Sequence, residues 1–150
     1  MTTMTAESVE NLMLRVTQEI RVRASLEKTF DALLEELGPA SQQPDGASMQ
    51  LKLEPWPGGR WFRDLGGDNG HFWATVQSIK RPGLLEFCGP LMMSHPVANN
   101  VIHRLKEEGG ETVIQFCHSA FGPIQPDHRE GVKAGWAHMH SKVRERAEQA

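Results

Sequence analysis

The chain has 150 residues, a formal net charge of -3, and 16 lysines and arginines that are scattered along its length rather than clustered. This length suits one domain whose core needs no disulfides. The acidic balance and the lack of a basic cluster argue against nucleic acid as a partner, and equally against an anionic membrane surface.

The N-terminus and the cysteines bear on location. Residues 1–11 are polar and small and have no periodicity, so they predict a flexible leader before a single domain over residues 12–150. They lack the segments of a signal peptide, and no apolar run in the chain approaches the ~20 residues of a membrane span. Cys88 and Cys117 fall in predicted strands, where we interpret them as small buried apolar groups rather than a disulfide. These features predict a reducing, cytoplasmic location and no membrane span.

A strand and a helix open the domain. Over residues 12–24 apolar side chains alternate with polar ones, which predicts a half-buried strand whose inner face is interrupted only by Gln18. Ser25 is then a good helix N-cap, and apolar residues at helical spacing up to a Gly-Pro pair predict a helix over residues 26–37. Residues 39–46 are turn-forming, and a short extra helical turn there stays open.

Turn signals then recur at short intervals and predict a single antiparallel meander. Gly- and Pro-rich turns separate the expected strands, which cover residues 49–54, 60–64, 71–80, 84–88, 97–107 and 111–121. A long amphipathic helix over residues 127–148 is expected to close the domain. Its apolar face consists of Val132, Trp136, Met139 and Val143.

The order strand, helix, about six antiparallel strands and long helix is that of the α+β helix-grip fold. In that fold a curved antiparallel sheet of about six to seven strands wraps around the C-terminal helix and leaves a cavity between them. At the residue level the chain resembles the SRPBCC superfamily, also called START-like or Bet v 1-like, and within it the homologues of the activator of heat shock protein 90 ATPase. The resemblance covers residues 13–148 and rests on the segments Ala24–Phe30, Pro57–Trp61, Val76–Pro82, His118–Phe121 and Glu130–Trp136.

The resemblance implies a protein that holds a ligand between sheet and helix. The activator itself needs a further N-terminal domain to engage its chaperone, and residues 1–12 are not expected to supply one, so co-chaperone activity does not follow. The turn Gly66–Gly70 and the loop Gly89–Pro96 depart from the commonest pattern of the family. We expect them to shape the mouth of the pocket.

Period two in the last two strands defines the expected inner face of the sheet. It places Asn99, Val101 and His103 on one strand, beside Phe116 and His118 on the next. The amide and the two imidazoles are then polar groups in a largely apolar cavity, where they would orient a small molecule. Bonding of the imidazoles to neighbouring backbone or water remains an alternative.

The predicted ligand-binding set combines these groups with aromatic and flexible side chains. Aromatic rings could floor a pocket for a flat or aliphatic molecule, although they are also ordinary core material, and methionine fills irregular pockets or cores alike. The set is Leu51, Trp61, Trp73, Phe87, Asn99, Val101, His103, Phe116, His118, Trp136 and Met139.

Metal and catalytic chemistry find little support in the residue spacing. There is no Cys-x-x-Cys, and His138 and His140 diverge by about 160° on a helix, so no metal or other cofactor is expected. His118 and Ser119 are adjacent in a strand and face opposite sides, which disfavours nucleophilic catalysis. His103 and His118 stay candidate catalytic groups, because imidazoles titrate near neutrality.

The favoured hypothesis is a non-enzymatic protein that binds a hydrophobic or amphipathic small molecule. One alternative is an aromatase-like or cyclase-like enzyme in which cavity histidines move protons. Another is a partner-binding protein, acting with a chaperone or in a stress-response pair, for which the loop Leu91–Met93 is the candidate surface. A homodimer is a further open expectation.

Overall fold

A computed structural model of the protein describes residues 11–91 and 95–149. The predicted leader, except for Asn11, lies outside the described residues, and so do Met92 and Met93 of the candidate surface loop. The elements in chain order are β1 (Met13–Val22), α2 (Leu26–Leu37), β2 (Leu51–Leu53), β3 (Arg60–Gly66), β4 (Asn69–Lys80), β5 (Leu84–Gly89), β6 (Ala98–Glu108), β7 (Glu111–Phe121) and α3 (Pro126–Gln149).

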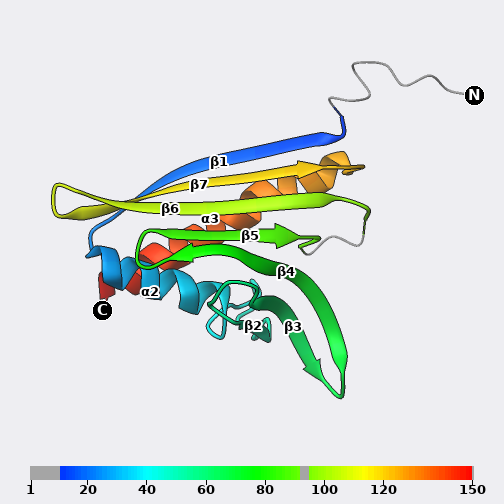
Figure 1. The fold of residues 1–150 in the computed structure, drawn as a ribbon, viewed down its shortest axis with the longest axis horizontal. Coiled ribbons are helices and arrows are strands. Elements are labelled where there is room, and N and C mark those ends of the chain that lie inside the picture. Colours follow the sequence, from blue (N-terminus) through cyan, green and yellow to red (C-terminus); the bar gives the residue numbers. More distant parts are fainter. Residues whose placement is uncertain (1–10, 92–94, 150) are drawn as a thin grey trace, which may run out of the picture.

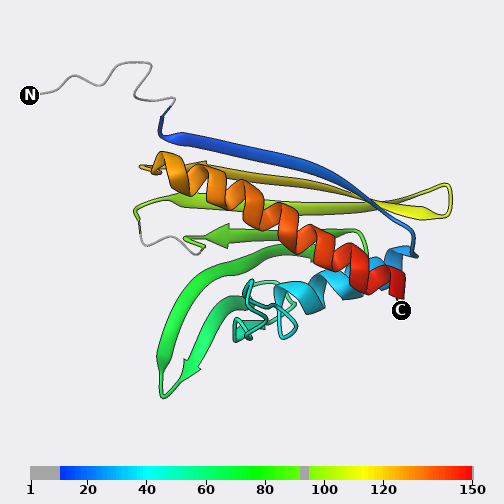
Figure 2. The ribbon, with the colours of Figure 1, turned by 180° about the vertical axis from the view of Figure 1, so that it is seen from behind.

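The strands form one antiparallel sheet of seven strands in the order β1-β7-β6-β5-β4-β3-β2. Strands β2 to β7 follow one another as a meander, and β1 completes the sheet by pairing with β7. The sheet is curved, and α3 crosses one face of it diagonally with α2 beside its C-terminal end (Figure 1, Figure 2). The predicted helix-grip architecture is confirmed.

Local sequence signals explain both helices. Ser25 caps α2, because its side-chain oxygen accepts a hydrogen bond from the backbone N–H of Lys28 at 3.2 Å. Helix α3 begins one residue earlier and ends one residue later than predicted. Residues 39–46 form turns and part of an isolated bridge instead of an extra helical turn. Neither helix of the described chain is long and apolar enough to cross a membrane.

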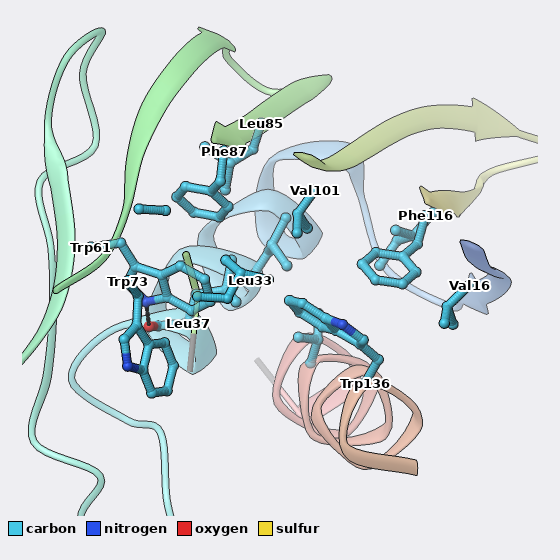
Figure 3. Close-up of a cluster of buried hydrophobic side chains, with 14 of the residues drawn as sticks. Val16, Leu33, Leu37, Trp61, Trp73, Leu85, Phe87, Val101, Phe116 and Trp136 are labelled. Atoms are coloured by element: carbon cyan, nitrogen blue, oxygen red, sulfur yellow. Dashed lines mark hydrogen bonds between the residues drawn. The ribbon is translucent and has the colours of Figure 1, made fainter. Parts of the chain in front are cut away.

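The inner face predicted for the last two strands is buried in the structure. Val101 and His103 of β6 and His118 of β7 are fully buried, and Phe116 of β7 is 3 % exposed. Val101 and Phe116 belong to the main hydrophobic cluster between the sheet and α3 (Figure 3). Period-two alternation therefore identified the face of the sheet that carries the core.

The interpretation of both cysteines as buried groups was wrong. Cys88 is exposed and Cys117 is half-buried, and both thiols are free. Each cysteine follows an inward side chain, Phe87 in β5 and Phe116 in β7, so strand alternation turns the cysteine toward the outer face.

Candidate ligand-binding groove

A groove of about 1290 Å³ opens between α3, the segment after α2, and strands β2 to β4. Its floor comes from the strands, through Leu51, Trp61 and Trp73. Residues 40–46 form one wall, and residues of α3 between 128 and 149 form the other. Small-molecule sites are typically clefts of roughly 300 to 1000 Å³, so this groove has room for a ligand of ordinary size.

The floor is an aromatic surface held in place by its neighbours. The indoles of Trp61 and Trp73 meet edge to face with their centroids 5.0 Å apart, and Phe87 stacks on Trp61 at 4.6 Å. Trp61 Nε1 donates a hydrogen bond to the backbone oxygen of Leu37 at 2.7 Å (Figure 3). Trp73 Nε1 is buried and has no hydrogen-bond partner. The floor is thus a tightly packed aromatic cluster in which the N–H of Trp73 is buried without a partner.

A β-bulge brings Trp73 into this floor. The pairing of β3 with β4 slips at this point and leaves Trp73 as the extra residue of β4. Bulges re-aim side chains, and here the consecutive residues Trp73 and Ala74 are both buried, which strict alternation would not allow. Gly89 at the end of β5 permits the arrangement, because a Cβ there would lie 2.5 Å from the carbonyl oxygen of Trp73.

Two glycines keep the α3 wall open. Gly131 and Gly135 lie one turn apart and both line the groove. A Cβ added at either position would meet no neighbouring atom within 4 Å. Glycine inside a helix costs about 1 kcal/mol relative to alanine, so α3 is locally less stable where it borders the groove. Trp136 and Met139 present larger apolar groups along the same wall.

Charged side chains at the groove pair with one another. Arg146 Nε lies 2.7 Å from Glu36 Oε1 and joins α3 to α2. Lys142 Nζ lies 3.6 Å from Glu145 Oε2 within α3. Asp45 accepts a hydrogen bond from a backbone N–H of its own turn at 2.9 Å. The described lysine and arginine of the lining are therefore both matched by carboxylates.

His118 lies at the centre of a closed set of hydrogen bonds beside the groove. Trp136 Nε1 donates to His118 Nδ1 at 3.0 Å, and the other ring nitrogen, Nε2, lies 2.7 Å from Asn99 Oδ1. An indole N–H can only donate, so Nδ1 must be the acceptor and the proton of the neutral ring sits on Nε2. Burial lowers the pKa of His118 to about 4, so the imidazole is neutral at pH 7.

A second chain of hydrogen bonds connects β1 to β6 through α3. His140 Nδ1 lies 2.7 Å from Gln18 Oε1, and His140 Nε2 lies 2.9 Å from His103 Nε2. Gln18 also donates from Nε2 to the backbone oxygen of Lys133 at 3.3 Å, which fixes its amide orientation. His140 must then donate from Nδ1 and accept at Nε2. His103 donates from Nε2, and its Nδ1 is left as a buried acceptor without a partner.

Both imidazoles of this chain resist protonation. Burial lowers the pKa of His140 to about 4. Burial, followed by the repulsion of a charged His140, lowers the pKa of His103 well below its usual value. At neutral pH these groups act as neutral hydrogen-bonding groups that join the sheet to α3.

The structure divides the predicted ligand-binding set in two. Five of its members line the groove, and six lie in the packed layer beside it and do not line it. Those in the groove are Leu51, Trp61, Trp73, Trp136 and Met139, and those beside it are Phe87, Asn99, Val101, His103, Phe116 and His118. Figure 3 shows Trp61 and Trp73 on one side of Trp136 and Phe116 on the other.

Several residues of the site were not found from the sequence. His140 is buried, although it could have been placed on the inner face of α3 because it follows Trp136 by four residues. Gln18 could have been suspected, because it is a polar residue on the otherwise apolar face of the first strand. The contribution of Gly131 and Gly135 to the groove could not be predicted, because a glycine in a helical pattern does not show whether the space beside it is open or filled by another element.

The described residues offer little for catalysis or metal binding. Neither His103 nor His118 lines the groove. Within residues 11–91 and 95–149, no group of three or more His, Cys, Asp or Glu side chains could hold a metal ion.

Comparison by sequence and comparison by structure give different results for this protein. No family model matches the sequence, and no curated protein is significantly similar to it. Solved structures do match: the Aha1 dimer from Colwellia psychrerythraea has 16% identity and a TM-score of 0.66 and covers 90% of this chain and 96% of its own. Ara h 8.0201 has 11% identity and a TM-score of 0.65, with 92% and 99% covered. The di-domain ARO/CYC StfQ from the steffimycin biosynthetic pathway has 10% identity and a TM-score of 0.64, with 95% and 52% covered.

A curved antiparallel sheet that grips a C-terminal helix and leaves a groove between them defines the class as a helix-grip protein. The neighbours place this fold among those of the SRPBCC, START-like or Bet v 1-like proteins, as the resemblance predicted. At 10 to 16% identity the likeness concerns the fold.

Proposed function

We propose that the protein binds a hydrophobic or amphipathic small molecule in the groove between α3 and the sheet. The observation that carries the proposal is the combination of an indole floor, from Trp61 and Trp73, with a wall that glycines leave open. An apolar molecule in the groove would cover half-buried apolar side chains of the lining, such as Met49 and Met139, and burial of apolar area stabilises a complex by roughly 25 cal/mol per Å² before the costs of association.

The enzymatic alternative receives no comparable support. A general acid or base must reach the reacting atoms directly or through one water. His118 has both ring nitrogens in hydrogen bonds to protein groups, and His103 is fully buried against His140. Both side chains are better explained as polar groups that position α3 on the sheet. A homodimer, a chaperone partner and a cytoplasmic location stay predictions from the sequence.

Filling the groove from α3 tests the proposal. Gly135→Phe adds a ring where the lining is open, and we expect it to weaken binding of the uncharged apolar dye Nile red at least about tenfold, equivalent to about 1.4 kcal/mol. Fluorescence titration measures the affinity. Thermal unfolding should show a melting temperature equal to or above that of the wild type, because a helical glycine has been removed.

Ala137→Phe is the matched control, because Ala137 is an exposed residue of the same helix that does not line the groove. It should leave the dye affinity within about twofold of the wild type. Equal binding by Gly135→Phe and the wild type would place the dye outside the groove and contradict the proposal.

A further inference from the structure

Strand β1 leaves one edge of the sheet without a neighbouring strand. It pairs with β7 on one side, and no other described element lies beyond it on the other side (Figure 1, Figure 2). This edge lies at the opposite end of the strand order from β2, which borders the groove. An unpaired edge exposes backbone N–H and C=O groups to which another strand can bind.

Alternate residues of β1 direct these backbone groups outward. The carbonyl oxygen of Leu12 accepts a hydrogen bond from the backbone N–H of Gly122 at 2.7 Å, so the even-numbered residues are those that bond to β7. The odd-numbered residues of β1 therefore present their N–H and C=O groups to the open edge. Their side chains are exposed on the outer face of the sheet.

Side chains of α3 cover the two ends of this edge. Arg129 Nη1 donates a hydrogen bond to the backbone oxygen of Met13 at 2.6 Å. At the other end, Glu148 Oε2 accepts one from the backbone N–H of Arg23 at 2.8 Å. The edge is thus open over residues 15–21, which is the length of an ordinary strand.

The exposed charges of this open stretch complement one another in one register. If two copies of β1 pair antiparallel about Thr17, Arg15 of each copy lies opposite Glu19 of the other. A register two residues further along would set Arg15 opposite Arg21, and like charges directly opposite destabilise a sheet. A shift in the other direction would set Glu19 opposite Met13, whose backbone oxygen is already bonded.

Arg15 and Glu19 are available for such pairing. Arg21 is held within its own chain, because its guanidinium lies 3.0 Å from Glu108 and 3.4 Å from Glu111. In the part of the chain that the structure describes, Arg15 and Glu19 make no ion pair. An oppositely charged residue of a second copy would supply each of them with a partner.

We propose that two copies of this chain associate through β1, antiparallel and centred on Thr17, so that their sheets continue into one another about a two-fold axis. Thr17 pairs with Thr17, and Arg15 with Glu19, and each pair exchanges two backbone hydrogen bonds. The interface is short, so we expect a weak dimer with a Kd on the order of 1 to 100 μM. Both grooves stay open, because they lie away from β1.

Charge reversal tests the register. Arg15→Glu sets two glutamates opposite each other, and Glu19→Arg sets two arginines opposite each other, twice in each dimer because of the axis. Each variant alone should weaken dimerisation at least about tenfold, measured by sedimentation equilibrium in about 50 mM salt. An equimolar mixture of the two variants should form a heterodimer with a Kd within about threefold of the wild type, because both cross-strand pairs are again of opposite charge.

Two further variants separate charge from backbone pairing. Arg104→Glu makes the same change in net charge at an exposed position of β6, away from the edge, and should leave the Kd within about twofold of the wild type. Thr17→Pro removes an outward N–H at the centre of the interface. Proline is tolerated in edge strands, so this variant should keep the circular dichroism spectrum of the wild type and lose the dimer.

Hydrogen exchange gives a direct readout. The amides of Arg15, Thr17 and Glu19 should exchange more slowly as the protein concentration rises, whereas the even-numbered amides of β1 are protected at every concentration. A chain that stays monomeric up to about 1 mM, which would leave the edge to solvent or to a strand of another protein, overturns the proposal. So does a dimer that Arg15→Glu, Glu19→Arg and Thr17→Pro leave unchanged, or a mixture of the two charge variants that does not associate.

Discussion

Between pH 7.5 and pH 4.5 the protein is expected to lose a large part of its stability, because its buried histidines stay neutral while the same residues protonate in the unfolded chain. Burial lowers the pKa of His118 and His140 from 6.5 to about 4. At 1.36 kcal/mol per pKa unit, each residue contributes roughly 3 kcal/mol to this loss. His103, whose pKa is lowered further by its burial and by His140, adds in the same direction.

The sign follows from the order in which the two states take up protons. Above about pH 7 neither state protonates these rings, so the free energy of unfolding is flat. As the pH falls through 6.5 the unfolded chain binds protons first, and the native state loses stability until the folded-state pKa near 4 is reached. The half-buried Glu54, whose pKa Arg60 lowers to about 2, changes stability only below about pH 4.5 and so falls outside this window.

Urea unfolding followed by circular dichroism at four pH values in this range measures the effect. His140→Gln should make the dependence on pH shallower, because one buried imidazole is gone. His138→Gln, which replaces an exposed side chain of the same helix, is the matched variant with which the slope of His140→Gln is compared. A free energy of unfolding that stays constant from pH 7.5 to 4.5 would contradict the buried neutral histidines.

Trp136→Ala is expected to be the most damaging single substitution in α3, with a loss of about 3 to 5 kcal/mol from the cavity alone. The indole is 5 % exposed and packs against Phe116, with ring centroids 4.7 Å apart. It also donates to His118 Nδ1 at 3.0 Å, so truncation leaves a buried acceptor without a partner and adds roughly 1 to 3 kcal/mol. Chemical denaturation at pH 7.5 gives the change in the free energy of unfolding.

Two variants separate the contributions to this loss. Trp136→Phe keeps most of the ring but removes the N–H, and it should cost less than alanine while still leaving His118 Nδ1 unpaired. Trp56→Ala removes an indole that is 55 % exposed and should change stability by no more than about 0.5 kcal/mol. If Trp136→Ala cost as little as Trp56→Ala, the indole would not be the anchor of α3.

Most of the fold could be predicted because its signals are local. Ser25, as a good N-cap residue, predicts the start of α2, and the alternation of apolar residues with period two predicts the inner face of β6 and β7. The bulge at Trp73 could not be predicted, because it depends on how β3 slips against β4 rather than on either sequence alone. Cys88 shows the same limit. Cysteine is usually a buried residue type, but alternation along β5 decides which face of the sheet its side chain lies on, and here that face is exposed.

The groove was harder to place than the fold. The sequence identified polar side chains on the inner face, including Asn99 and His118, but these satisfy one another within the packed layer. The open space lies further along the sheet, where the segment after α2 stands away from Gly131 and Gly135 of α3. Its position depends on the spacing between elements far apart in the chain, which periodicity within one element does not encode.

The most direct test of the binding groove is a map of chemical-shift changes when Nile red is added to uniformly ¹⁵N-labelled protein. The account predicts the largest changes at the indole signals of Trp61 and Trp73 and at the backbone amides of Gly131 and Gly135. Changes confined to the outer face of the sheet around Cys88 and Cys117, or no changes at saturating probe, would contradict it.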